Sequence, residues 1–450
     1  MSQAVQDNST SAVMIERRRM FNQFCQTLDN QNIPYVILSG YQGYPDQIDS
    51  DVDFMVSEAD FAKLPHLFKE SKTHFGAPLI QVLQHETTAC YYILANQVGG
   101  RIAYLHPDAA ASYRRKGRLW LQSDAVLSSR QQTATGFWVP ATAVEFEYYF
   151  VKRIDKRLVE ARHLERLASL LASDFEACHA VVASLVPANQ VEMIINAIQV
   201  QDVAWFASQR DVLQAMLADS HSKESLFARL SSFFKNVIRQ VHRILHPTGL
   251  VVAVLGPDGS GKTTVIEHIE SEFSPAFRKL NRYHLRPHFG KQGTGSVVTN
   301  PHASPPRSAL AGLAKMVLFL VDYWWGYIRR IYPAKVRSTL VIFDRHFYDM
   351  LVDPTRYRLP QRFWPAKLFA KLIPQPDVWL VLDAPPALLV SRKGEIDLTS
   401  AEMLTSRYRA LAQSLPNAYI VNTGGTLEET YSNAIRILLA ALAKRQGQQV

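Results

Sequence analysis

The stretch that decides the fold is GPDGSGKTT, residues Gly256–Thr264. It matches the phosphate-binding loop pattern G-x-x-x-x-G-K-[ST] in full. The apolar run LVVAVL at 250–255 precedes it and is typical of a strand buried on both faces. The segment VIEHIESEF at 265–273 follows it and predicts a helix. A strand, a glycine-rich turn and a helix are the context that this motif requires.

The residue types of the loop explain how it would bind phosphate. Gly256, Gly259 and Gly261 allow backbone conformations that a side chain would block, so that successive N–H groups can turn inward. With the positive end of the following helix, these groups form a cradle for the α- and β-phosphates. Lys262 can reach the β/γ-phosphate oxygens, and the Thr263 hydroxyl can bind Mg²⁺. We therefore predict a nucleotide site made of Gly256, Pro257, Asp258, Gly259, Ser260, Gly261, Lys262, Thr263 and Thr264.

Further apolar segments follow the loop and predict the architecture of the C-terminal half. Strands are expected at 281–285, 339–343, 378–382 and 418–421, and helical stretches separate them. This alternation predicts an α/β fold with a doubly wound parallel sheet. Catalytic residues are then expected just beyond the carboxyl ends of the strands.

Charged residues lie at those strand ends. Asp344 ends the strand 339–343, where it can hold Mg²⁺, and Arg345 offers a fork of donors suited to phosphate oxygens. Arg392 and Lys393 open a charged segment whose cations can close over a transferring phosphoryl group. The alternative for Asp344 and Arg345 is a structural ion pair. The alternative for Arg392 and Lys393 is a solvated helix end.

Together these segments resemble the thymidylate kinase family of nucleoside monophosphate kinases. The resemblance covers about 249–450 and rests on GPDGSGKTT, on Asp344-Arg345-His346, on LDAPP at 382–386, on SRKGEID at 391–397 and on Arg407-Tyr408. It implies an enzyme that transfers the ATP γ-phosphoryl group, with Mg²⁺, to a phosphorylated small molecule, most simply dTMP.

The same resemblance implies roles for single residues. Asp258 would contact the sugar hydroxyl of the acceptor, Arg345 and Arg286 would hold its phosphate, and Arg392 would act from a lid. The chain departs from the family where His346 replaces a tyrosine and where the glutamate that should follow Arg286 is missing. The residues that would recognise the acceptor base are not marked.

Two aspartates near the N-terminus form a second candidate site. Asp51 and Asp53 open the predicted strand DVDFMV at 51–56, after a strand at 35–38, and period two places both on one face. Such a pair can hold a divalent metal, whereas the alternative is a solvated turn. The stretch resembles the nucleotidyltransferase fold of the DNA polymerase β superfamily. In the later strand at 101–108, Tyr104 stands where that family has its third acid, and Asp108 is expected beyond the strand.

The remaining chain is expected to be helical between the two sites. A helix is predicted at 12–30, and helical periodicity dominates 141–245. The last helix there has apolar residues at three- and four-residue spacing, and this face is expected to pack against flanking domains. Its apolar residues are Leu226, Leu230, Phe233, Val237, Val241 and Ile244. We therefore predict a nucleotidyltransferase-like α+β domain at 1–140, a helical connector at 141–247 and the kinase-like domain at 248–450.

Composition limits the function classes. The chain has 450 residues, 47% of them hydrophobic, and a net charge of +9, which fits anionic substrates. No arginine-rich arm or RNA-binding aromatic motif is present, which argues against a nucleic-acid partner. Three widely spaced cysteines argue against disulfides and zinc, and no signal-peptide pattern begins the chain, so a cytoplasmic protein is expected.

Membrane association and oligomeric state stay open at this stage. No apolar run is expected to reach membrane-spanning length. The apolar segment 316–328 predicts a buried helix, with an interfacial helix ending at Arg329 and Arg330 as the alternative. Peripheral membrane contact and a homodimer are both compatible with the sequence.

Three functions remain as hypotheses. The first is phosphoryl transfer by the C-terminal domain. The second is nucleotidyl transfer to a sugar phosphate or protein at Asp51 and Asp53. The third is an assembly protein that binds ATP with little turnover.

Overall fold

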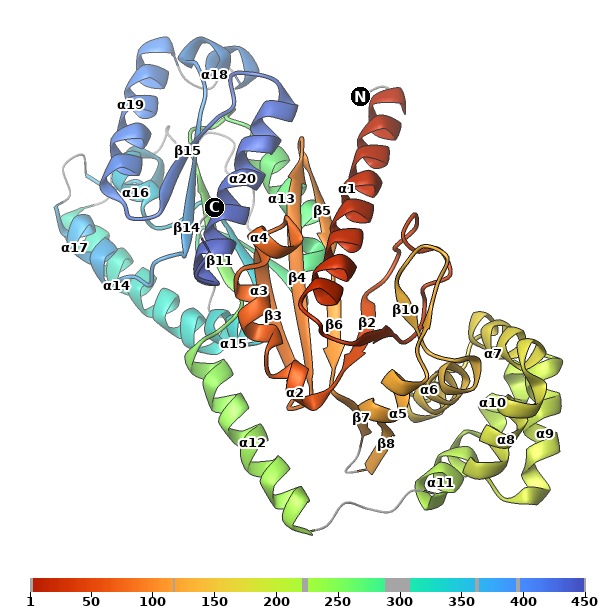
Figure 1. Ribbon diagram of the computed structural model, residues 1–450. Coiled ribbons are helices and arrows are strands. Elements are labelled where there is room, and N and C mark those ends of the chain that lie inside the picture. Colours follow the sequence, from red (N-terminus) through yellow and green to blue (C-terminus); the bar gives the residue numbers. More distant parts are fainter. Residues whose placement is uncertain are drawn as a thin grey trace. The chain divides into compact units, whose positions relative to one another are not determined.

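The fold is described from a computed structural model, which covers residues 3–115, 118–220, 226–287, 308–360, 364–393 and 397–448 (Figure 1). The chain divides into two compact units, one of Met14–Leu94 with Tyr104–Gln240, the other of Met1–Val13, Ala95–Ala103 and Val241–Val450. The division into three domains stays a prediction. We describe each unit by itself.

A five-stranded parallel sheet forms the centre of the C-terminal half (Figure 1). Its order is β12-β13-β11-β14-β15, and every neighbouring pair is parallel. The predicted doubly wound α/β fold is therefore confirmed. The bounds are β11 Leu250–Leu255, β12 Lys279–His284, β13 Thr339–Asp344, β14 Val378–Asp383 and β15 Ala418–Asn422.

Helices cover this sheet, and both of its faces are buried at the central strand. Val251, Ala253 and Leu255 of β11 belong to one large apolar core, whereas Val252 and Val254, which point the other way, are also fully buried. The helices are α13 Lys262–Phe273, α14 Ala309–Gly326, α15 Tyr332–Val336, α16 Asp349–Val352, α17 Pro365–Leu372, α18 Pro386–Lys393, α19 Leu398–Ser414 and α20 Leu427–Arg445.

The prediction that no segment reaches membrane-spanning length is wrong. A π-helical turn, Tyr327–Ile331, joins α14 to α15, so that Ala309–Val336 is one helix of 28 residues, long and apolar enough to span a membrane by length and composition. The prediction of a buried helix holds for one face. Met316, Phe319 and Tyr323 lie in the core, whereas Leu318 and Val321 are exposed.

A second, mixed sheet contains the N-terminal strands. Its order is β1-β2-β6-β4-β3, and β5 pairs with β4. The segment 101–108, expected to be a single strand, is divided between β5 and β6. Its strands are β1 Tyr35–Ile37, β2 Val52–Val56, β3 Leu79–Glu86, β4 Ala89–Val98, β5 Arg101–Leu105 and β6 Pro107–Ala110.

The position of Asp108 corrects a second expectation. Asp108 lies inside β6, and β6 runs parallel to β2 with Asp108 directly opposite Asp53. This pairing could not be predicted from the sequence because β6 has only four residues, too few for a periodicity that would mark a separate strand. The third carboxylate is thus present, although not at the position of Tyr104.

Helices and short hairpins complete the N-terminal half. The predicted helix at 12–30 starts earlier, as α1 Gln3–Asn30. Cys25, Cys90 and Cys178 are free and buried. The smaller elements are α2 Glu58–Phe61, α3 Leu64–Lys69, α4 Ser71–Phe75, β7 Ser112–Arg115, β8 Arg118–Gln122, α5 Ser123–Ser128, β9 Gln131–Gln132 and β10 Trp138–Val139.

The predicted helical segment is a compact bundle followed by one long helix. The bundle has its own apolar core and consists of α6 Thr142–Asp155, α7 Ala161–Ser173, α8 Phe175–Leu185, α9 Ala188–Gln199, α10 Val203–Ser208 and α11 Arg210–Ser220. Helix α12, Leu226–Leu245, forms as predicted. Phe233, Val237, Val241 and Ile244 of its apolar face are 40–61% exposed, and the packing of this face against flanking domains stays a prediction.

A histidine in the C-terminal core makes the stability of this unit sensitive to acid. His346 is 1% exposed, and the rings of Trp379, Tyr323 and Phe343 lie 4.9–5.4 Å from its own. Burial lowers the pKa of this histidine to about 3. Because the unfolded chain binds the proton more readily, stability is complete above the ordinary histidine pKa and falls as the pH drops below it.

We predict that His346→Phe removes this acid sensitivity. Between pH 6.5 and 5 the wild type should lose about 2 kcal/mol of unfolding free energy through this group, at about 1.4 kcal/mol per pH unit. Urea unfolding at a series of pH values measures the difference. His66→Phe, at an exposed histidine, is the control. Equal slopes for wild type and His346→Phe would contradict the prediction.

Candidate functional site

The phosphate loop joins the carboxyl end of β11 to the first turn of α13. Gly256 has φ +148°, and a Cβ there would lie 2.9 Å from both the Leu382 carbonyl oxygen and the Ser260 hydroxyl, so that only glycine fits. Gly261, with φ +85°, precedes the first helical residue, Lys262. The first N–H groups of a helix have no intrahelical partner and attract anions. The loop therefore has the geometry of a phosphate cradle.

Lys262 is folded back onto this loop. Its ammonium donates to the carbonyl oxygens of Gly256 and Pro257, at 2.9 and 2.7 Å, and the residue is only 8% exposed. Burial, together with the nearby Arg345 guanidinium, lowers the pKa of Lys262 to about 8. Burial separates this ammonium from the water that would stabilise its positive charge. A nucleotide phosphate beside it would stabilise that charge instead.

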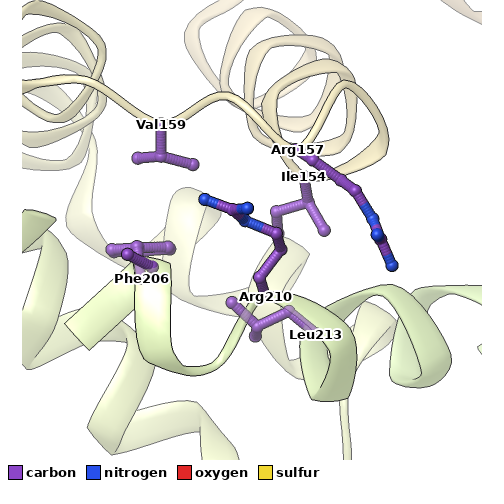
Figure 2. Close-up of a pocket in the computed structure, with 7 residues that line it drawn as sticks. Ile154, Arg157, Val159, Phe206, Arg210 and Leu213 are labelled. Atoms are coloured by element: carbon purple, nitrogen blue, oxygen red, sulfur yellow. The ribbon is translucent and has the colours of Figure 1, made fainter. Parts of the chain in front are cut away.

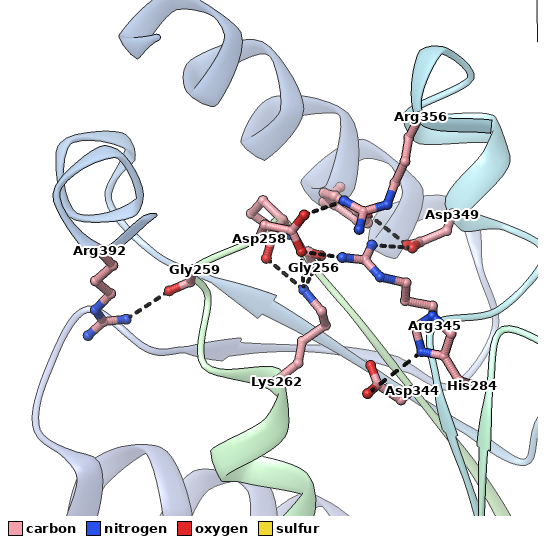
Figure 3. A network of polar contacts seen from close by, with 12 residues as sticks. Gly256, Asp258, Gly259, Lys262, His284, Asp344, Arg345, Asp349, Arg356 and Arg392 are labelled. Atoms are coloured by element: carbon pink, nitrogen blue, oxygen red, sulfur yellow. Dashed lines mark hydrogen bonds and ion pairs between the residues drawn. The ribbon is translucent and has the colours of Figure 1, made fainter. Parts of the chain in front are cut away.

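The Asp258 carboxylate contacts three cationic side chains of the site. Figure 3 shows its carboxylate between Lys262, Arg345 and Arg356. Both arginines donate hydrogen bonds to it, and Lys262 Nζ lies 3.6 Å from Asp258 Oδ1. Burial opposes its ionisation, but the three cations outweigh burial and lower the pKa of Asp258 well below the usual range. This carboxylate is therefore ionised and holds the arginines near the loop.

A second carboxylate, that of Asp349, also accepts a hydrogen bond from Arg345. Asp349 is completely buried and accepts hydrogen bonds from Arg345, at 2.6 Å, and from the hydroxyls of Tyr357 and Tyr408, at 3.2 and 2.7 Å. Arg345 itself has φ +70° and is 4% exposed. Two carboxylates on one guanidinium fix its direction, and they raise the pKa of Arg345 although burial opposes this.

Asp344 lies at the end of β13, as predicted, and is available as an oxygen ligand. Burial opposes its ionisation, but hydrogen bonds from His284 and Arg282 lower its pKa to about 2. Arg282 donates to it at 2.9 Å. An ionised carboxylate and the Thr263 hydroxyl are the donors that suit Mg²⁺, which takes few protein ligands beside the substrate phosphates. These two residues therefore fit the predicted role.

Two predicted arginines lie apart from the central network. The guanidinium of Arg286 is 3.2 Å from the Asp322 carboxylate and 4.7 Å from the ring centre of Phe319. Arg392 is exposed and donates to the Gly259 carbonyl oxygen at 3.3 Å, on the other side of the loop in Figure 3. The predicted lid also includes 394–396, which lie outside the described residues. The roles of both arginines stay predictions.

Three residues of the site were not recognised from the sequence. Arg356 lies on a short 3₁₀ turn, Thr355–Tyr357, and Asp349 begins a helix of four residues, α16. Neither element has a periodicity or a motif that would mark it. Tyr408 belongs to the pair Arg407-Tyr408 on which the resemblance rests, but its contact with Asp349 depends on the packing of α19 against α16.

The N-terminal carboxylates lie close together but are already partnered. Asp51 accepts from the Tyr91 hydroxyl at 2.7 Å, and Lys152 donates to Asp53 at 2.6 Å. Burial and the charges of Asp53 and Asp51 raise the pKa of Asp108 to about 7. In the described parts of the chain, no group of three or more His, Cys, Asp or Glu side chains is arranged to hold a metal ion. The predicted metal role of Asp51 and Asp53 stays a prediction.

Residues of the helical bundle line two cavities in the described part of the chain, and neither cavity is a clear ligand site. The cavity in Figure 2 lies between Ile154, Val159, Phe206 and Leu213 and has a volume of about 20 Å³, enough for about one water molecule. A larger cavity of about 350 Å³ has Arg157 and Asp211 in its lining, and these two form an ion pair with each other. Neither cavity is lined by phosphate-loop residues.

Comparison with known proteins connects the C-terminal half with thymidylate kinases. No known protein-family profile matches the chain. The thymidylate kinase of Xanthomonas euvesicatoria pv. vesicatoria is 29% identical over 209 residues, 45% of this chain and 88% of that protein. The thymidylate kinase of Xylella fastidiosa is 29% identical over 215 residues, 46% of this chain and 94% of that protein.

Two solved structures that match part of the chain are also thymidylate kinases. The thymidylate kinase of Candida albicans matches 44% of this chain and 94% of its own, with 17% identity and a TM-score of 0.33. That of Ehrlichia chaffeensis matches 43% of this chain and 99% of its own, with 16% identity and a TM-score of 0.31.

The parallel sheet and the phosphate loop of the C-terminal half are consistent with a P-loop kinase domain, and the sequence similarity supports an enzyme. Over about 45% of the chain its sequence is similar to thymidylate kinases, which supports a nucleoside monophosphate kinase-like function.

We predict that Asp349→Asn destabilises the C-terminal unit by about 3 kcal/mol, because it leaves a buried guanidinium without its full counter-charge. Urea unfolding measures the loss. The matched control is Asp383→Asn, since Asp383 pairs with Arg409, whose side chain is 50% exposed. That variant should lose less than about 1 kcal/mol. Similar losses for both variants would show that the buried pair has no special role.

Proposed function

We propose that the C-terminal domain transfers the γ-phosphoryl group of ATP to a nucleoside monophosphate, with dTMP as the preferred acceptor. The cluster of Lys262, Arg345 and Arg356 around Asp258, directly at the phosphate loop, is the observation that carries the proposal. Phosphoryl transfer needs positioning and charge neutralisation more than covalent help from the protein. Three cations at the loop supply both.

The predicted roles can be assigned to these positions. The N-terminus of α13 and Lys262 would hold the β- and γ-phosphates, and Thr263 and Asp344 would hold Mg²⁺, which neutralises charge on the phosphates. Arg345 is held from both sides by carboxylates and would present a fixed guanidinium to the acceptor phosphate. Its rigid position favours in-line alignment of donor and acceptor.

Arg356 extends the predicted acceptor site. It donates to the same Asp258 carboxylate as Arg345, but its side chain is more exposed, at 23% against 5%. A partly exposed cation at this position can exchange its carboxylate partner for a phosphate oxygen of the acceptor. Arg286 and Arg392 would act from the sides of the site, as the resemblance implies.

The proposal is tested by ADP release from ATP and Mg²⁺ with dTMP, other nucleoside monophosphates and several sugar phosphates as acceptors. We expect release with dTMP, and a loss of about 10²–10³-fold in turnover for Lys262→Ala, the usual effect of removing a group that stabilises transition-state charge. The double variant Asp51→Asn/Asp53→Asn should retain turnover.

Other outcomes would each change the proposal. Release with a sugar phosphate alone would keep the kinase chemistry and replace the acceptor. Turnover of Lys262→Ala within a few-fold of the wild type would overturn it. Binding of ATP without release for every acceptor would favour the assembly protein. A cytoplasmic location and a homodimer stay expectations from the sequence.

A second candidate function is nucleotidyl transfer by the N-terminal domain. The observation that favours it is the parallel register that places Asp108 opposite Asp53, which lies two residues after Asp51. Burial, and then the negative charges of Asp53 and Asp51, raise the pKa of Asp108. Against it stands Lys152, whose ammonium occupies one oxygen of Asp53, so that the arrangement as it stands does not fit a metal ion. The first candidate is therefore preferred.

The second candidate is tested in the Lys262→Ala background, where kinase turnover is removed. We expect Asp108→Asn to abolish any transfer of label from α-labelled nucleoside triphosphates, because the cluster then lacks its third carboxylate. Asp49→Asn, at an exposed aspartate of the preceding loop, is the matched control and should leave transfer unchanged. If the Lys262→Ala protein transfers no label at all, this candidate is excluded.

A further inference from the structure

One face of the C-terminal unit exposes an unusual amount of apolar surface. Helix α14 has its buried residues on one side, and the opposite side presents Leu310, Leu313, Val317, Val321, Trp324 and Ile328, each 41–81% exposed. Their spacing of three and four residues keeps them on one stripe. Such a continuous exposed stripe is rare on a protein that has no partner.

Helix α17 extends this surface. Ala366 and Ala370 of α17 belong to the same core as α14, and the indole N–H of Trp324 donates to the Leu372 carbonyl oxygen at 2.9 Å. The two helices are therefore in contact, as Figure 1 also shows. The outer side of α17 adds exposed apolar side chains. We call the exposed stripe of the previous paragraph, together with the neighbouring exposed residues Leu318, Trp325, Leu368 and Leu372, the α14–α17 face.

Charges around the α14–α17 face have one sign. The segments 308–337 and 364–376 contain a single acidic residue, Asp322, which is 5% exposed and pairs with Arg286. The exposed charged residues of both segments are all basic: Arg329, Arg330, Arg337, Lys367 and Lys371. An apolar face with exposed tryptophans and a basic rim suits the interface of an anionic bilayer, where indoles and long basic side chains meet the headgroups.

We propose that the α14–α17 face binds the surface of a membrane that contains anionic lipids, with α14 lying in the plane of the interface. A spanning orientation is disfavoured because the inner side of α14 packs on the kinase core and carries Asp322. A second copy of the chain fits less well. In a two-fold symmetric contact, the exposed basic residues around the face of one copy would meet the same basic residues of the other copy. Neither segment has an exposed carboxylate that could neutralise them.

The proposal is tested by flotation of the full-length protein with vesicles of phosphatidylcholine alone and of phosphatidylcholine with phosphatidylglycerol. We expect binding to the second kind only, weakened by added salt because the rim charges are exposed. Leu318→Ser/Ile328→Ser should lose about tenfold or more in vesicle affinity, since it removes two side chains from the face. Met193→Ser/Val200→Ser, at equally exposed apolar residues of the helical bundle, is the control.

Charge reversal tests separately the contribution of the exposed basic residues around the α14–α17 face. Lys367→Glu/Lys371→Glu should lose at least about fivefold in affinity per lysine, because each basic residue near an anionic surface contributes about that factor. Arg436→Glu/Lys444→Glu, with the same change of net charge on α20, should have a much smaller effect. ADP release without vesicles is measured for every variant and should be unchanged, which separates membrane binding from the kinase proposal.

Two outcomes would overturn the proposal. The first is an equal affinity of wild type, face variants and controls for both kinds of vesicle. The second is a dimer in sedimentation velocity that Leu318→Ser/Ile328→Ser dissociates, without vesicle binding, which would assign the face to a second copy.

Discussion

The buried contact between Asp349 and Arg345 is the constraint on which the site depends. A fully buried carboxylate costs much free energy unless it is paired, and Asp349 is paired by one guanidinium and two tyrosine hydroxyls. These donors come from the end of β13, from the 3₁₀ turn after α16 and from α19. The contact therefore joins three distant segments, and through Arg345 it fixes the position of Asp258 in the phosphate loop.

The side chains around the phosphate loop form a set of cations held by protein carboxylates and carbonyl oxygens. Lys262 donates to loop carbonyls, and Arg345 and Arg356 donate to Asp258. Each of these donors suits a phosphate oxygen equally well. In the proposed function, substrate phosphates would replace these partners, and donors that are already in place cost little reorganisation at the moment of transfer.

The fold could be predicted where local patterns are strong. The five parallel strands lie within about two residues of their expected bounds, because an apolar strand followed by a helical segment has few other solutions. The prediction failed where a pattern was short or was compatible with two structures. β6 has four residues and was read as the end of another strand, so that Asp108 was misplaced. For the apolar segment 316–328 the sequence leaves a buried and an interfacial helix open, since sequence alone does not show which face a core will cover.

The sequence by itself determined the phosphate loop, the parallel sheet and the acidic and basic residues at the strand ends, because these depend on neighbouring residues and on backbone conformation. Only the tertiary structure decided which charges meet. Asp349 and Arg356 have no local signature, and their contacts with Arg345 and Asp258 exist because separate elements meet at the same edge of the sheet. The contact of Tyr408 with Asp349 likewise depends on the packing of α19 against α16. The exposure of the α14–α17 face was likewise decided by packing. A helix with apolar residues on two sides can bury either side in the core and leave the other exposed.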